Sequence, residues 1–92
     1  ASRIATEINI ASRYIGYEKV LQIPTTISGG PYSLQIVAGS VLVSYTSIAP
    51  VNYYYPLETK NVTNPKGHSV FEINTSRGYI NIKNVGGKVI IE

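Results

Sequence analysis

Apolar residues change their spacing once along the chain, close to Gly16. Before this glycine they recur at intervals of three and four, which places them on one face of an α-helix. These residues are Ile4, Ile8, Ala11 and Ile15. The spacing predicts a helix over residues 2–15 that stops at Gly16 and packs on the remaining chain, because so short a helix frays alone. Arg3 and Glu7 fall on its other faces, and a strand beginning at Ile8 is the alternative.

From residue 17 onward apolar and polar residues alternate, as in half-buried β-strands. Turn signals separate the runs, at Ser28-Gly29-Gly30-Pro31, at Ala38-Gly39 and at residues 84–87. We expect strands at residues 20–23, 32–36, 41–45, 51–55, 68–73, 78–83 and 88–92, with residues 51–55 as an edge strand or a wide loop. Residues 60–67 form a polar loop, and Tyr32 and Tyr45 belong to the core.

About seven short strands at this spacing predict an all-β fold, either an immunoglobulin-like antiparallel β-sandwich or an open barrel, preceded by a short helix. The pattern divides the chain into a helical stub, residues 1–16, and a β-sandwich domain, residues 17–92.

No cysteine and no aspartate occur among the 92 residues. Disulfides, thiol chemistry and Cys-ligated metal sites are therefore excluded, and a Ser-His-Asp triad lacks its acid. The only histidine, His68, stands beside a glycine turn, where a surface role is expected. Glu58 and Glu72 remain geometrically possible as an acid–base pair, although solvated carboxylates on strand faces are favoured. The sequence predicts no enzyme, no cofactor and no metal site.

Lysine and arginine outnumber glutamate by eight to five, which gives a net charge of +3. The basic residues are scattered singly, so nucleic-acid binding is not predicted. Charged residues are only 14% of the chain, and together with abundant Tyr, Ser, Thr and Asn this indicates an extracellular protein. No apolar run is long enough to span a membrane.

Three of the eight tyrosines are consecutive, Tyr53, Tyr54 and Tyr55. Tyrosine offers a large contact area and a polar tip, so the triplet predicts a contact surface. The alternative is that these rings pack in the core while their hydroxyls reach solvent. Strands 41–45 and 88–91 are expected to offer open edges for homo-oligomerisation. The candidate interface residues on them are Val41, Val43, Val89 and Ile91.

Two Asn-x-Ser/Thr sequons begin at Asn61 and Asn74. Both lie near turn signals, as glycosylation acceptors in surface loops do. They are candidate glycosylation sites, and Asn61, in the expected polar loop, is the better one.

Several short motifs follow one another in a characteristic order. An amphipathic helix ends at Gly16-Tyr17. After it come, in this order, the segments Val20-Leu21-Gln22-Ile23-Pro24, Ile27-Ser28-Gly29-Gly30, Tyr32-Ser33-Leu34-Gln35-Ile36, Gly78-Tyr79-Ile80-Asn81-Ile82 and Gly87-Lys88-Val89-Ile90-Ile91. This order resembles the extracellular domains of archaeal proteins exported with class III, type IV prepilin-like signal peptides. It is most similar to the archaellum accessory families FlaG and FlaF.

The resemblance implies a β-sandwich ectodomain in the cell envelope, outside the membrane, as part of the archaellum stator. It also implies a membrane anchor helix upstream of Ala1, of which the helical stub, residues 1–16, would be the end. FlaF proteins bind the S-layer and FlaG proteins self-associate, so the implied partners are an envelope or S-layer protein and the chain itself. Two alternatives remain, a type IV pilin-like filament subunit and a secreted adhesion module that binds glycans through Tyr53, Tyr54 and Tyr55.

Overall fold

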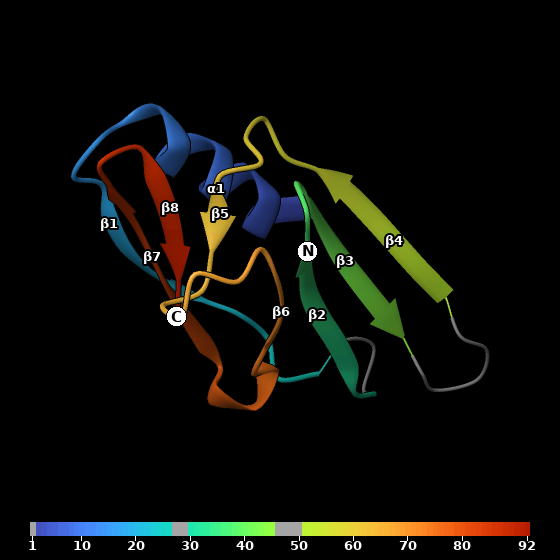
Figure 1. Ribbon diagram of the computed structural model, residues 1–92. Coiled ribbons are helices and arrows are strands. Elements are labelled where there is room, and N and C mark those ends of the chain that lie inside the picture. Colours follow the sequence, from blue (N-terminus) through green and yellow to red (C-terminus); the bar gives the residue numbers. More distant parts are fainter. Residues whose placement is uncertain (1, 27–29, 46–50) are drawn as a thin grey trace.

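The computed structural model describes residues 2–26, 30–45 and 51–92, and these form one helix followed by eight strands (Figure 1). The elements are α1 (Ser2–Arg13), β1 (Glu18–Gln22), β2 (Tyr32–Val37), β3 (Ser40–Tyr45), β4 (Val51–Pro56), β5 (Val62–Thr63), β6 (Val70–Ile73), a 3₁₀ turn η1 (Thr75–Arg77), β7 (Tyr79–Val85) and β8 (Lys88–Ile91). The predicted all-β fold with a short N-terminal helix is confirmed. Strand β5 falls inside the expected polar loop. The sequence does not predict it, because a two-residue strand is too short to show alternation.

The strands form two sheets of four, in the orders β1-β7-β8-β5 and β4-β3-β2-β6. All pairs are antiparallel except β5 and β8, which run parallel. The two layers are compatible with the expected β-sandwich. Their strand order differs from that of a constant-type immunoglobulin domain, in which the first strand pairs with the second.

A two-residue turn joins β2 to β3, as Ala38-Gly39 predicts. Both residues have positive φ, 38° at Ala38 and 94° at Gly39. This type I′ geometry follows the right-handed twist of the strands and sets Val37 opposite Ser40. The turn expected at residues 28–31 lies largely outside the described residues, since Ser28 and Gly29 are not among them.

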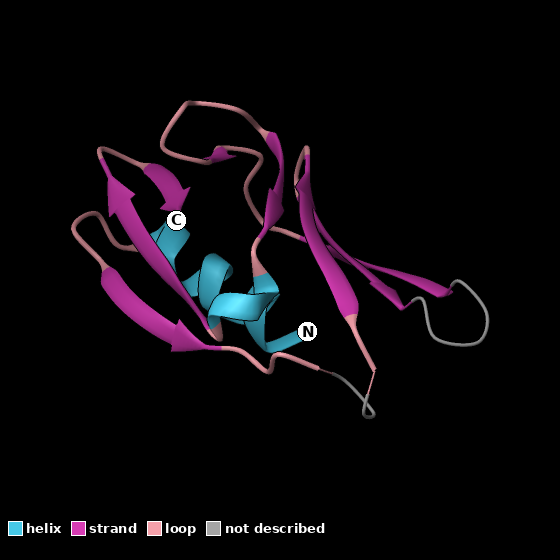
Figure 2. Ribbon diagram, turned by 90° about the horizontal axis from the view of Figure 1, so that it is seen from below, coloured by secondary structure: helices cyan, strands magenta, loops and turns pink. Residues whose placement is uncertain are grey.

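Helix α1 lies between the two sheets (Figures 1 and 2). It contacts β7 and β8 of the first sheet and β3 and β4 of the second. The helix and both sheets therefore share one core, which runs across the expected boundary at residue 16. The core residues are Ile4, Ala5, Ile8, Ala11, Leu21, Ile23, Tyr32, Leu34, Ile36, Val41, Val43, Val62, Ile73, Ile80, Ile82, Val89 and Ile91.

Two expectations about the helix are wrong. Ile15 is 77% exposed and does not continue the buried face, because the helix ends at Arg13. Glu7 is buried rather than on an outer face, because the helix has a sheet on more than one side. Tyr32 is buried as expected, and its hydroxyl donates to the Pro24 carbonyl. The side chain of Tyr45 lies outside the described residues.

Asn84 connects the last hairpin with the end of the helix and the entry to β1, which are distant from it in sequence. Its side chain is buried, and its Nδ2 donates to the Ala11 carbonyl near the C-terminus of α1 at 2.8 Å. Its Oδ1 accepts from the Gly87 N–H in the β7–β8 turn at 2.9 Å. Its backbone N–H donates to the Tyr17 carbonyl and its carbonyl accepts from the Gly16 N–H. Through its side chain and its backbone, this one residue thus holds the helix end, the entry to β1 and the last hairpin together.

Thr63 in β5 is a local imperfection of the core. It is buried, and its hydroxyl oxygen has no hydrogen-bond partner among the described residues. A buried hydroxyl without a partner loses its hydration and gains nothing in return.

We expect Asn84→Ala to lower the free energy of unfolding by about 2–3 kcal/mol, because it removes the buried hydrogen bond to the Ala11 carbonyl and the part-buried bond from the Gly87 N–H. Urea denaturation monitored by circular dichroism measures this change. Asn81→Ala in the same strand is the matched control, since Asn81 is only partly buried. Equal losses in the two variants would contradict the role given to Asn84.

Thr63→Val should raise the free energy of unfolding by about 1 kcal/mol, because it replaces an unpaired buried hydroxyl with a methyl group of similar size. The same denaturation measurement tests it. Thr59→Val is the control, since the Thr59 hydroxyl accepts from the Asn61 N–H and the substitution removes that bond. A loss of stability in Thr63→Val would show that the hydroxyl is satisfied in solution.

Candidate interaction surface on strand β4

Strand β4 carries the three consecutive tyrosines at the edge of the second sheet. Figure 1 shows it on the outer side of the projecting β3–β4 hairpin. Tyr53 and Tyr55 lie opposite the buried Val43 and Val41 of β3. Residues opposite each other in an antiparallel pair share a face, so both rings lie on the core side of the sheet. Tyr54 lies on the outer face.

The three rings differ in exposure. Tyr55 is half-buried and packs against the core. Tyr53 is 48% exposed and Tyr54 is 63% exposed. Tyr55 therefore anchors the strand, while its two neighbours present aromatic surface to solvent.

Four strands in the described residues stand at sheet edges, and β4 differs from the other three. Strand β1 carries Glu18 and Lys19, β6 carries Glu72, and β5 is two residues long. Charges and short length are the usual means by which an edge avoids pairing with another chain. Strand β4 has six residues and no charge, and only its terminal Pro56 interrupts the ladder.

The hydrogen-bonding pattern determines which backbone groups of β4 face outward. The Leu57 N–H donates to the Gly39 carbonyl at 2.9 Å. Hydrogen-bonded pairs recur at every second residue of an antiparallel ladder, so Tyr55 and Tyr53 also bond to β3. The backbone groups of Asn52, Tyr54 and Pro56 therefore point away from β3. Pro56 lacks an N–H, which leaves two donors on this edge.

Four other residues expected at an interface lie in the core instead. Val41, Val43, Val89 and Ile91 are at most 2% exposed. Strand β3 lies between β4 and β2, and β8 lies between β7 and β5, so neither offers an open edge. The expectation is wrong for these residues because their apolar side chains fill the space between the sheets.

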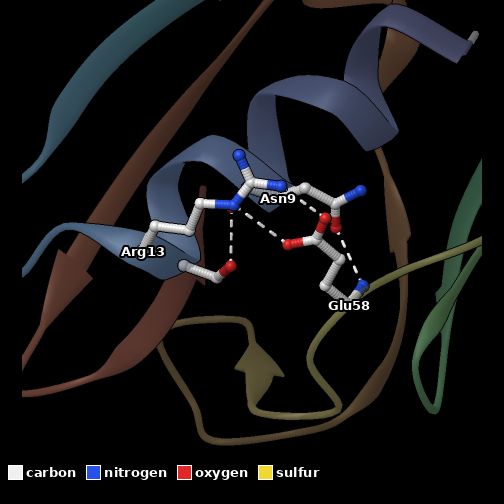
Figure 3. A network of polar contacts seen from close by, with 4 residues as sticks. Asn9, Arg13 and Glu58 are labelled. Atoms are coloured by element: carbon white, nitrogen blue, oxygen red, sulfur yellow. Dashed lines mark hydrogen bonds and ion pairs between the residues drawn. The ribbon is translucent and has the colours of Figure 1, made fainter.

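The two candidate acidic residues lie in different surroundings. Glu58 accepts from Arg13 through both carboxylate oxygens, at 2.5 and 3.1 Å, and its N–H donates to Asn9 Oδ1 at 2.9 Å (Figure 3). The carboxylate raises the pKa of Arg13 through its hydrogen bond and its charge. Glu72 lines a groove of about 240 Å³ beside β6 together with Phe71. Glu58 does not line this groove, so the structure brings no acid–base pair together there.

A second ionic contact connects α1 to the start of the first sheet. Glu7 accepts from Lys19 Nζ and from the Tyr17 hydroxyl, both at 3.0 Å. The hydrogen bond from Lys19 holds the pKa of Glu7 below its usual value of 4.5, against the opposing effect of burial. Burial and the bond to Glu7 raise the pKa of Tyr17. These groups stabilise the packing of the helix, and sequence spacing gave no sign of the contact.

The remaining candidates lie on loops. His68 is exposed, and its backbone N–H donates to Asn64 Oδ1. Within the described residues, no group of three or more potential metal ligands forms a cluster. Asn61 is exposed, but the threonine of its sequon, Thr63, is buried. Asn74 is exposed, and its Oδ1 caps η1 by accepting from the Ser76 N–H.

Comparison of the chain with protein-family models, curated proteins and solved structures finds no match.

We expect the Glu7 contact to make stability depend on pH in a defined direction. The pKa of Glu7 is lowered on folding, so its contribution is present above the unfolded-state pKa and is lost as pH falls through the folded-state pKa. The stability difference between the wild type and Glu7→Gln should therefore be largest near neutral pH and shrink below about pH 4. Urea denaturation between pH 7 and pH 3 measures it. Glu72→Gln, on an exposed strand position, is the control, and a pH-independent difference for Glu7→Gln would contradict the prediction.

Proposed function

We propose that this chain is a structural interaction domain of an archaeal cell-surface filament machine and assembles with protein partners through the open edge of β4. The observation that carries the proposal is an uncharged six-residue edge strand with two exposed tyrosines. An exposed edge offers backbone donors and acceptors to an added strand, and neighbouring side chains add specificity. The domain needs no catalytic group for this role.

The setting of the proposal comes from the resemblance to archaellum accessory proteins. In that setting the domain stands outside the membrane and contacts an envelope or S-layer protein, or another copy of itself, as part of the stator. Among the described residues no helix has the length and apolar character needed to cross a bilayer. The membrane attachment in this proposal rests on a helix upstream of Ala1. A pilin-like filament subunit, polymerising through that same helix, is the related alternative.

One feature of the outer sheet face favours a second candidate, the binding of glycans. Tyr54 lies opposite Leu42, Leu42 lies opposite Gln35, and Gln35 lies opposite Glu72. This row places an exposed aromatic ring on the same face as an amide and a carboxylate. Glycan-array binding that is abolished by Tyr54→Ala would support this function, and an array without binding would retire it.

We expect Tyr54→Lys to weaken partner binding about tenfold or more, because a charged residue on an edge strand opposes pairing with another chain and the substitution also removes an exposed aromatic contact. Val20→Lys is the matched control, since Val20 is 62% exposed on the edge strand β1. Binding of the tagged chain to purified S-layer protein and to the untagged chain is measured by biolayer interferometry. Equal binding by Tyr54→Lys and the wild type, or equal loss in the control, would contradict assembly through β4.

A further inference from the structure

We infer that the occupant of this edge is β4 of a second copy, paired antiparallel about a twofold axis with Tyr54 opposite Tyr54. The inference rests on the proposed role of the β4 edge and names its partner and its register. A twofold axis through the middle of β4 would bring the same surface of two molecules together, as in most homodimers.

The backbone groups of the edge are self-complementary in this register. Tyr54 of each copy donates to and accepts from Tyr54 of the other, because its N–H and carbonyl face outward. Asn52 lies opposite Pro56 of the other copy and donates to its carbonyl. Pro56 has no N–H to leave unpaired. Every outward N–H described on β4 then finds an acceptor, and the two four-stranded sheets become one continuous sheet.

Charge does not prevent two copies from pairing at this edge. The chain carries a net charge of +3, which opposes association of two copies in general. Strand β4 has no charged residue, so pairing it with itself brings no like charges face to face. The nearest acidic side chain along the chain, Glu58, is already paired with Arg13.

The side chains of β4 gain contacts in the same register. The two Tyr54 rings meet on the outer face, where each is now 63% exposed. Tyr53 of each copy lies opposite Tyr55 of the other on the core side, so its exposed half packs against an anchored ring. Aromatic cross-strand pairs of this kind stabilise antiparallel sheets. Two six-residue strands make a contact smaller than a standard interface of about 1,600 Å², so we expect a dissociation constant in the micromolar range or weaker.

A shifted register is the competing geometry. Moving one strand by two residues places Asn52 opposite Tyr54 and Tyr53 opposite Tyr53. It also satisfies the outward donors, but it leaves Tyr54 without an aromatic neighbour across the axis. The two registers bring different residues to the twofold axis, which makes them separable by cross-linking.

Single-cysteine cross-linking tests the inference, because the chain has no native cysteine. We expect Tyr54→Cys to form disulfide dimers under mild oxidation about tenfold faster than Val20→Cys, since directly opposed residues lie within disulfide reach. A mixture of Asn52→Cys and Pro56→Cys chains with different tags should cross-link preferentially between the two variants. Circular dichroism confirms that each variant is folded, and the mixed pair provides the test if Tyr54→Cys is not.

Faster cross-linking of Tyr53→Cys than of Tyr54→Cys would overturn the register. Cross-linking of all β4 variants at the rate of Val20→Cys would overturn the pairing of two copies. That second result leaves the proposed function standing if Tyr54→Lys still abolishes binding to S-layer protein. Loss of both the cross-link and the effect of Tyr54→Lys would remove the β4 edge as a binding surface altogether.

Discussion

The amide of Asn84 holds the fold together at the point where the helix meets the first sheet. It satisfies the Ala11 carbonyl near the end of α1 and the Gly87 N–H of the last hairpin, two groups that are far apart in sequence. A chain of 92 residues without cysteine has no disulfides to stabilise it, so its stability depends on non-covalent contacts, above all on packing. The helix supplies this packing by filling the space between the sheets, and Asn84 fixes its position there.

Local patterns predicted most of the strands, because alternation and turn residues act over a few positions. The Ala38-Gly39 turn shows this, since both residues adopt the positive φ that the hairpin needs. Contacts between distant segments could not be predicted in the same way. The helical spacing puts Glu7 on an outer face, whereas the folded chain buries it. Its bonds to Tyr17 and Lys19 depend on how the helix packs against the sheets, which the spacing does not show. The two-residue strand β5 exists only through its pairing with β8.

The residues of the candidate surface could likewise be predicted only in part from the sequence. Three consecutive tyrosines are visible in the sequence, so Tyr53 and Tyr54 could be selected from their residue type and spacing. The edge position of a strand depends on the sheet order, which pairs β1 with β7 and leaves β4 outside β3. Val41 and Val89 were expected at open edges because the sequence of an interior strand resembles that of an apolar edge.

The arrangement of the hairpin explains how an open edge can coexist with a small, stable core. Strand β3 contributes Val41 and Val43 to the core and is paired on both sides. Tyr55 anchors β4 to that core, whereas Asn52 and Tyr54 direct their backbone groups outward. A strand added at this edge would therefore extend an existing sheet without disturbing the packing around α1. Binding and folding would depend on different residues, so substitutions at Tyr54 and at Asn84 should affect them separately.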